Sequence, residues 1–145
     1  MAQFEIREGI LDDAPLLVEL CEQLGYQVST TRLRERLPYL LNNPEHVVYV
    51  AGLGRADVAG WVHGYLVRLL ESEVFVEIGG LVVDRDRRGV GVGRALMAAV
   101  EEWARKQRVM TVRLRSNVVR DGAHHFYRRI GYEVVKQQLT FQKSL

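Results

Sequence analysis

The sequence has few of the residues that build a disulfide, a cysteine-based metal site or a membrane span. It contains one cysteine, Cys21, among 145 residues, which excludes an internal disulfide and a zinc site made of cysteines. No apolar run approaches the roughly 20 residues of a transmembrane helix. Residues 1–15 include acidic side chains and lack the apolar segment of a signal peptide. We therefore expect a cytoplasmic protein with no membrane partner.

The chain also carries little net charge. Its 20 Lys and Arg residues nearly balance 18 Asp and Glu residues, which leaves a formal charge of +2. So small a charge gives no argument for a nucleic acid as partner. Hydrophobic residues make up 48% of the chain and charged residues 26%, as in a globular protein. At this length we expect one domain, residues 1–145, with its own core.

Hydrophobic periodicity predicts the order β-α-α-β-β-β-α-β-α-β. Strands are expected at 4–8, 47–53, 58–69, 74–83 and 109–116, with one or two more within 132–143. Helices are expected after Asp12 or Asp13, after Ser29, over 93–106 and over 121–130. Because hairpins and crossovers both occur, the expected fold class is α/β (α+β). It would have a single mixed, mostly antiparallel sheet of about six to seven strands, flanked by about four helices.

The stretch Asp84–Met97, DRDRRGVGVGRALM, places four arginines and three alternating glycines at the start of a predicted helix. Backbone amides at a helix start lack partners within the helix and attract anions, and glycines let phosphate oxygens approach closely. The ending Gly93-Arg94-Ala95 excludes a P-loop, and the glycine spacing is not that of a dinucleotide fingerprint. A phosphate cradle and a sharp turn of solvated charges both stay open.

Two motifs resemble the GNAT superfamily of N-acetyltransferases. Residues 77–104 look like its acyl-CoA-binding core and contain an R-x-x-G-x-G pattern from Arg88 to Gly93. GAHHFYRRIGY, residues 122–132, resembles the family's A-x-x-F-Y-x-x-x-G-[FY] signature. The predicted order of elements is also the family's order. The resemblance covers nearly the whole chain and implies acetyl-CoA as cosubstrate.

The resemblance also implies a cofactor site. Backbone amides of the R-x-x-G-x-G loop hold the CoA pyrophosphate in the family, which assigns this role to Arg88, Gly89, Val90, Gly91, Val92, Gly93 and Arg94. The preceding strand is splayed by a bulge and pairs with the pantetheine arm, through positions matching Leu81, Val82 and Val83. The Gly79-Gly80 pair by itself indicates such a bulge.

The second motif contributes further residues to the implied site. Many members bind the pantetheine arm with an asparagine, and this sequence has Arg120 at that position and Asn117 three residues earlier. Either residue could take the role. His124 and Phe126 are added to the expected cofactor site from the same motif.

Two residues carry the catalysis that the resemblance implies. Tyr127 matches a tyrosine that commonly serves as general acid toward the departing sulfur, although its helical spacing from Ala123 and Ile130 also suits a core aromatic. Glu77 matches a glutamate that takes the amine proton in several members, although strand alternation could equally point it to solvent. The expected reaction is the transfer of the acetyl group of acetyl-CoA to a primary amine, which attacks the thioester directly. The first expected acceptor is a small molecule.

Other functions stay open. A CoA-sensing or regulatory module without turnover would keep the same loop, and acetylation of protein lysines or N-termini would use the same chemistry. An arginine cluster that binds another polyanion predicts steep salt dependence with no preference for CoA. Dimers are common in the family, which leaves a homodimer open. We expect no nucleic-acid partner.

The four histidines do not predict a metal site. His124 and His125 are adjacent on a predicted helix and point about 100° apart. His46 and His63 are distant in sequence and lack the spacing of metal ligands. We therefore expect no metal.

On one predicted strand His63 alternates with Trp61 and Tyr65. The GNAT family often lines its acceptor site with this strand, so the resemblance implies the wall of an acceptor site, and a core face suits these residues equally well.

Overall fold

The computed structural model describes residues 4–116, 118 and 120–145. The chain divides into two compact units, one that ends at Leu114 and one that begins at Arg115. The elements of the first unit are β1 (Glu5–Glu8), η1 (Leu11–Asp13), α1 (Ala14–Gln23), α2 (Thr30–Leu41), β2 (His46–Gly52), β3 (Gly60–Val67), β4 (Phe75–Val83), η2 (Arg85–Arg87), α3 (Val92–Lys106) and β5 (Val112–Leu114). The second unit contains α4 (Asp121–Arg129). In the part described, no helix is long and apolar enough to cross a membrane.

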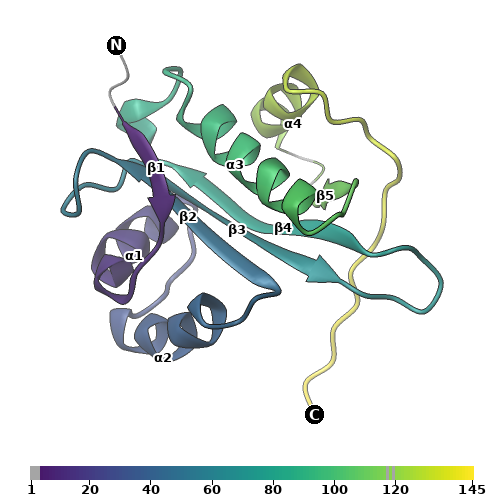
Figure 1. Ribbon diagram of the computed structural model, residues 1–145, viewed down its shortest axis with the longest axis horizontal. Helices are drawn as coiled ribbons and strands as arrows, with labels where there is room; N and C mark the ends of the chain where they lie inside the picture. Colours follow the sequence, from purple (N-terminus) through teal and green to yellow (C-terminus); the bar gives the residue numbers. More distant parts are fainter. Residues whose placement is uncertain (1–3, 117, 119) are drawn as a thin grey trace. The chain divides into compact units, whose positions relative to one another are not determined.

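The first unit is built on a single sheet whose strands lie in the order β1-β2-β3-β4-β5 (Figure 1). The first four strands pair antiparallel with their neighbours in sequence, and β5 pairs parallel to β4. Antiparallel neighbours can be joined by short turns, whereas a parallel step needs a crossover, which α3 provides here. The expected mixed, mostly antiparallel sheet with four helices is confirmed.

The expected count of six to seven strands is not confirmed, because the sheet has five. The sequence predicts the additional strands within 132–143, where the second unit has no regular secondary structure. Val135 and Phe141 in this segment are 76% and 89% exposed. Alternating apolar residues indicate a face suited to burial, but a strand also needs a partner for its backbone groups. The expectation of one domain over 1–145 stays a prediction.

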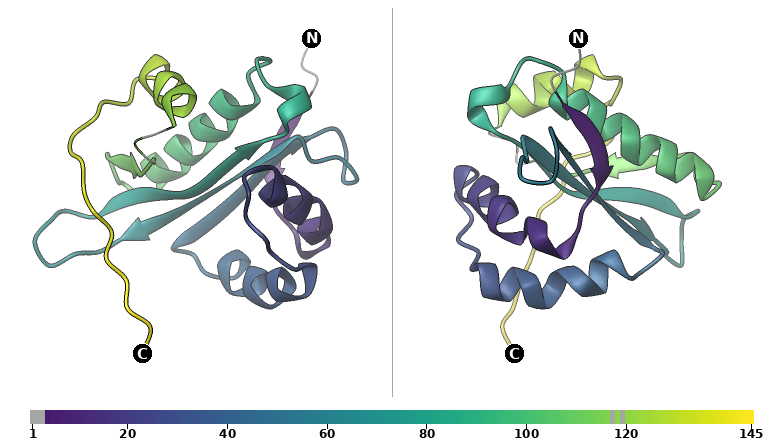
Figure 2. Two further views of the ribbon diagram at one scale, coloured as in Figure 1. Left: turned by 180° about the vertical axis from the view of Figure 1, so that it is seen from behind. Right: turned by 60° about the vertical axis from the view of Figure 1, so that its left-hand side comes forward.

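Helix α3 covers one face of the sheet, and α1 and α2 cover the other (Figure 2). The stripe of α3 that the periodicity predicts is buried, with Leu96, Met97 and Val100 at most 1% exposed. Two glycines of β3 face this helix. A Cβ at Gly60 would fall 3.1 Å from Leu96, and a Cβ at Gly64 would fall 2.8 Å from Val100. The helix therefore lies close against β3.

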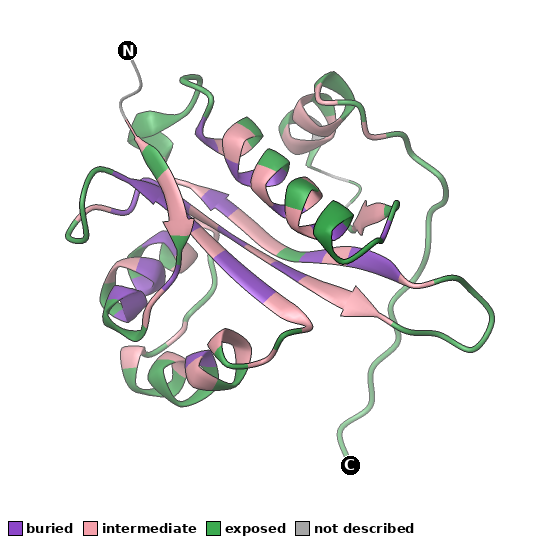
Figure 3. Ribbon diagram, viewed as in Figure 1, coloured by how far each residue is buried: buried purple, intermediate pink, exposed green. Residues whose placement is uncertain are grey.

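The other face has its own apolar cluster, which joins α1 and α2 to the sheet. Leu17 and Leu20 of α1 and Leu37 of α2 pack in one cluster with Val50 of β2, and Trp61 of β3 packs against its edge. Figure 3 shows the buried residues gathered on the strands and on the sides of α1 and α3 that face them. The α1/α2 face therefore has its own apolar core.

A buried ion pair joins β1 to the start of α1. The Asp13 carboxylate, only 1% exposed, accepts hydrogen bonds of 2.8 and 2.9 Å from the two terminal guanidinium nitrogens of Arg7. It also accepts one of 2.8 Å from the backbone nitrogen of Ile10. A buried carboxylate is tolerated when it is paired in this way. The sequence predicts Asp12 or Asp13 as a helix cap. Asp13 stands at the N-cap position of α1, but its side chain makes no capping hydrogen bond to that helix and instead pairs with Arg7 of β1.

Replacing Gly64 by alanine tests how closely α3 lies on the sheet. The added Cβ would fall 2.8 Å from Val100 Cγ1, so one of the two elements must shift. Overpacking of this kind costs about 1–3 kcal/mol, and we expect a lower thermal midpoint for Gly64→Ala. Gly122→Ala is the control, because its Cβ would meet nothing within 4 Å and alanine suits a helix. Equal midpoints for Gly64→Ala and wild type would contradict the close packing.

Candidate active site

The first structural feature of the site is a β-bulge between β3 and β4. Opposite His63 lies Gly80, and opposite Gly64 lies Ile78, so Gly79 is an extra residue with no partner on β3. A Cβ at Gly79 would fall 2.7 Å from His63 Nδ1, and a Cβ at Gly80 would fall 2.8 Å from the Trp61 ring. The bulge that the Gly79-Gly80 pair predicts is therefore present, and larger residues would collide there.

Beyond the bulge, β4 continues without pairing with β5. It pairs with β5 over Val76–Ile78 only, whereas the strand itself continues to Val83. On that side, Gly79–Val83 have no partner strand among the described residues. Leu81 and Val83 are half-buried, and Val82 is 1% exposed. An extended ligand could therefore pair with this edge as an added strand, which fits the expected role of Leu81, Val82 and Val83.

The glycine loop that follows β4 leads directly into the start of α3. Gly89 and Gly91 have φ of 80° and 93°, the left-handed region in which glycine is favoured. Gly91 is the N-cap of α3 and offers no side-chain cap. The amides of Val92, Gly93 and Arg94 therefore begin the helix without helical partners, at the positive end of its dipole. Such a helix start suits a phosphate group.

Side chains around the loop support this geometry. Arg88, Val90 and Arg94 are exposed, and Arg88 Nε donates a 3.3 Å hydrogen bond to the carbonyl of Val83. Arg87 pairs with Asp57 at 2.7 Å. The pKa of Asp57 is lowered, chiefly because its carboxylate accepts a hydrogen bond from the Leu53 backbone, with Arg87 adding to the effect. Arg87 thus anchors the loop, whereas Arg88 and Arg94 lie open to an anion.

Gln23, at the end of α1, is a loop contact that the sequence analysis missed. Its side-chain nitrogen donates to Asp84 at 3.3 Å, and its side-chain oxygen accepts from the Arg85 backbone at 2.9 Å. Asp84 in turn accepts from the backbone of Asp86 at 3.1 Å. These residues lie about sixty positions from Gln23 in sequence, and no local pattern marks a contact of that kind. The start of the loop is thereby tied to α1.

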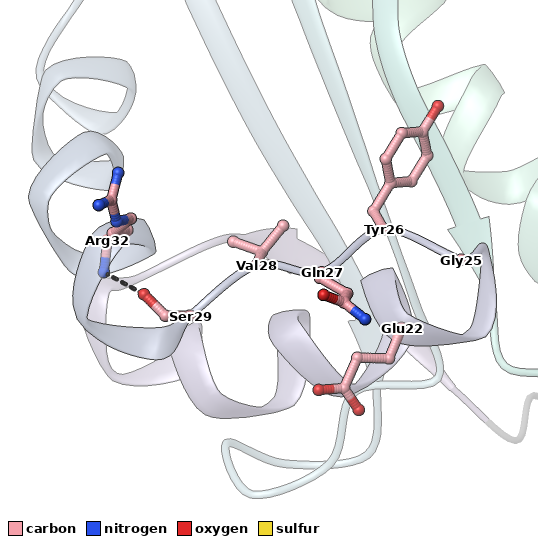
Figure 4. Close-up of a pocket in the computed structure, with 7 residues that line it drawn as sticks. All are labelled: Glu22, Gly25, Tyr26, Gln27, Val28, Ser29 and Arg32. Atoms are coloured by element: carbon pink, nitrogen blue, oxygen red, sulfur yellow. Dashed lines mark hydrogen bonds between the residues drawn. The ribbon is translucent and has the colours of Figure 1, made fainter.

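The segment between α1 and α2 borders a pocket of about 680 Å³ (Figure 4). Its lining residues are Glu22, Gly25, Tyr26, Gln27, Val28, Ser29 and Arg32. Ser29 caps α2 by accepting a 3.1 Å hydrogen bond from the Arg32 backbone. Glu22 and Arg32 are the charged residues of this lining.

Glu77 lies on the α1/α2 face of β4 within an aromatic cluster. The Tyr65 hydroxyl donates a 2.7 Å hydrogen bond to Glu77 Oε2. The rings of Tyr65, His63 and His46 stack with centroid separations of 5.2–5.4 Å, and Tyr39 of α2 meets His46 edge-on at 5.8 Å. Glu77 is half-buried and partnered. Tyr65 therefore holds the Glu77 carboxylate on this face, and the role of Glu77 as a base stays a prediction.

The two histidines of this cluster are uncharged near neutral pH. Burial lowers the pKa of His63 to about 4, and the repulsion between the protonated forms of His63 and His46 is the smaller cause. Burial also lowers the pKa of His46, with Glu45 opposing the shift. His46 Nδ1 and His63 Nε2 lie 2.9 Å apart, so one ring donates to the other. The cluster therefore offers a carboxylate and neutral rings to a cationic amine. Among the described residues, no group of three or more His, Cys, Asp or Glu is placed to hold a metal.

The second unit carries Tyr127 on α4. Its ring meets Phe126 and Tyr132 edge-on at centroid separations of 5.2 and 6.2 Å. Burial raises the pKa of the Tyr127 phenol, with the charge of Arg120 opposing the shift. The phenol is therefore protonated near neutral pH and can donate a proton. The half-buried ring also shows the packing that a core aromatic would show.

The remaining residues of the second motif lie around the start of α4. Arg120 is exposed at the N-cap, and its carbonyl accepts a 3.1 Å hydrogen bond from the His124 backbone. His124 and Phe126 are half-buried. Asn117 lies outside the described residues. The structure thus brings the expected pantetheine edge, the glycine loop and Glu77 together in the first unit, and groups Arg120, His124, Phe126 and Tyr127 in the second.

Known proteins are similar to this chain in sequence and in fold. The chain matches the Acetyltransferase (GNAT) family over residues 14–132. It is 30% identical over 143 residues to the aminoalkylphosphonate N-acetyltransferase of Salmonella typhimurium, spanning 97% of this chain and 91% of the relative. It is 29% identical over 145 residues to the aminoglycoside N(6')-acetyltransferase type 1 of Stenotrophomonas maltophilia, spanning 97% and 93%. The solved structure of AAC(6')-Iy in complex with the bisubstrate analogue CoA-S-monomethyl-acetylneamine has the same fold, with a TM-score of 0.85 at 16% identity over 99% of this chain and 100% of that one.

The chain is therefore an acyl-CoA-dependent N-acyltransferase. It belongs to the Acetyltransferase (GNAT) family, which confirms the resemblance drawn from its two motifs.

A carboxylate introduced at Val90 tests the phosphate cradle. Val90 is 55% exposed and lies between Gly89 and Gly91, so a longer side chain fits without strain on either glycine. Val90→Glu places a negative charge beside the expected phosphate, and like charges repel by about 1 kcal/mol or more near a surface. We expect the Kd for acetyl-CoA in calorimetry to rise about tenfold. Val90→Gln is the matched control and should stay within about threefold of wild type, whereas equal Kd values for Glu and Gln would contradict the cradle.

Proposed function

We propose that the protein transfers the acetyl group of acetyl-CoA to the primary amine of a small molecule. The observation that carries the proposal is the course of β4. From the bulge at Gly79 its unpaired edge runs through Leu81, Val82 and Val83 straight to the glycine loop and the start of α3. A strand rises about 3.3 Å per residue, so this edge can hold an extended arm with phosphate at one end and a thioester near the bulge.

The side chains around Glu77 and the named relatives both favour a small amine as acceptor. Glu77 and the neutral aromatic rings beside it suit an ammonium group. The relatives at 30% and 29% identity are named for aminoalkylphosphonates and for an aminoglycoside, both of which are small amines. These two classes are therefore the first acceptors to assay. Transfer to a protein lysine or N-terminus would use the same site and is the alternative outcome of that assay.

The proposed step is direct attack of the amine nitrogen on the thioester carbonyl carbon. Glu77, oriented by the hydrogen bond from Tyr65, takes the proton that the amine loses. The carbon–sulfur bond breaks, and the Tyr127 phenol gives its proton to the departing thiolate. The backbone amides of the α3 start and the guanidinium groups of Arg88 and Arg94 hold the phosphates. The products are the N-acetylated amine and CoA.

Conservative variants of the two proposed proton carriers test this step. Glu77→Gln keeps the size of the side chain and removes the base, and Tyr127→Phe keeps the ring and removes the acid. Since positioned acid–base groups contribute about 10²–10⁴-fold, we expect kcat to fall by at least 10²-fold for Glu77→Gln and by about tenfold or more for Tyr127→Phe. Acetyl-CoA binding by calorimetry should be unchanged in both. Wild-type protein that binds acetyl-CoA but acetylates no amine would favour a CoA-sensing module instead.

A further inference from the structure

We propose that His63 is a second ligand for the acceptor amine, through its Nδ1 atom, and that His46 is the positioning residue that keeps this atom unprotonated. The inference rests on the proposed function, in which Glu77 is the base, and adds His63 as a second residue that binds the amine. It concerns residues of β2, β3 and β4 within the first unit only.

The place of His63 Nδ1 is fixed by the bulge. A Cβ at Gly79 would fall 2.7 Å from this atom and 3.3 Å from a carbon of the Tyr65 ring. Both side chains therefore lie against Gly79, and the His63 ring occupies the position that a side chain at Gly79 would take. Gly79 itself is exposed. Tyr65 also holds Glu77 at 2.7 Å, which brings the carboxylate into the same group of side chains.

Gly79 lies at the end of the expected pantetheine edge. Leu81, Val82 and Val83 run from the glycine loop back toward Gly80 and Gly79 along β4. An arm anchored by its phosphates at the start of α3 would therefore carry its thioester toward the bulge. An amine that attacks the thioester must approach from beside Gly79. The polar side chains on this face of the sheet include His63, which lies against Gly79, and the hydrogen-bonded pair of Tyr65 and Glu77.

The pairing of the two histidines determines what His63 offers to that amine. Because both rings are neutral near pH 7, the 2.9 Å contact between His46 Nδ1 and His63 Nε2 contains one proton. If His63 Nε2 carries it, both rings have their proton on Nε2, the form that a free histidine side chain prefers in water. If His46 Nδ1 carries it, both rings take the less favoured form. The first arrangement leaves the lone pair of His63 Nδ1 over Gly79.

An unprotonated Nδ1 suits an ammonium group, which has only donors to offer. The ammonium would donate one hydrogen bond to Glu77 and another to His63 Nδ1, and Glu77 would then take the proton. His63 does not add positive charge to the site, because its burial keeps it neutral. His46 does not touch the amine in this account. It acts through its Nδ1 atom, which accepts the hydrogen bond that His63 Nε2–H donates.

Nuclear magnetic resonance tests the assignment without a substrate. Long-range ¹H–¹⁵N correlations on the wild-type protein near neutral pH report which ring nitrogen of each of its four histidines carries the proton. The His63 signals are assigned by their loss in His63→Gln. We expect Nε2 to be protonated and Nδ1 to be unprotonated in His63. A proton on Nδ1 would overturn the proposal, whatever the enzyme acetylates.

Two variants of His63 separate binding of the amine from a structural role. The amide of asparagine can place an oxygen near the position of Nδ1, whereas the amide of glutamine reaches the position of Nε2 and can keep the contact to His46. Since a hydrogen bond to a charged group is lost, we expect His63→Gln to raise the KM for the amine about tenfold or more and His63→Asn to raise it less. The KM for acetyl-CoA should be unchanged in both. A purely structural role predicts the reverse order, with glutamine the milder change.

The assay uses aminomethylphosphonate and the aminoglycoside sisomicin as acceptors. Turnover by wild type with an unchanged amine KM in His63→Gln would overturn the inference and leave the proposed function standing. No turnover of either amine by wild-type protein that binds acetyl-CoA would count against the proposed acceptors, and the proton position in His63 would then decide the inference alone.

Discussion

The site depends on one backbone irregularity, the bulge that Gly79 introduces into β4. By adding a residue opposite the His63–Gly64 bond, it shifts the register between β3 and β4. The pairing of β4 with β5 also ends at Ile78, one residue before the bulge. The same short stretch therefore leaves one edge of β4 without a partner strand among the described residues, and it places His63 and Tyr65 against Gly79 on the α1/α2 face. A regular strand would provide neither.

The rest of the first unit holds this irregular stretch in place. Gly60 and Gly64 let α3 lie close to β3, so the start of α3 is fixed where β4 ends. Gln23 and Arg87 then tie the intervening loop to α1 and to Asp57. On the α1/α2 face, stacked rings hold Tyr65 against Glu77. The edge of β4 without a partner strand, the position of the glycine loop and the face that carries Glu77 are thus three consequences of one sheet geometry.

The sequence predicts the features that depend on local backbone chemistry. The Gly79-Gly80 pair predicts the bulge that the structure contains. The glycines of the loop occur where the backbone needs a positive φ, at Gly89 and Gly91. Contacts made across the sheet could not be predicted in this way. The bond between His46 and His63 requires the β2–β3 register, and that of Gln23 joins residues about sixty positions apart. The expected strands within 132–143 are absent because alternation does not supply a partner strand.

The central claim is that acetyl-CoA lies along β4 with its phosphates at the start of α3. Backbone amide shifts recorded during a titration of ¹⁵N-labelled protein with acetyl-CoA test it most directly. The account predicts that the largest changes fall on Leu81–Val83 and on Gly89–Arg94, with small changes in β1 and in the core of α2. Saturable binding whose largest shifts lie away from β4 and the glycine loop would contradict it.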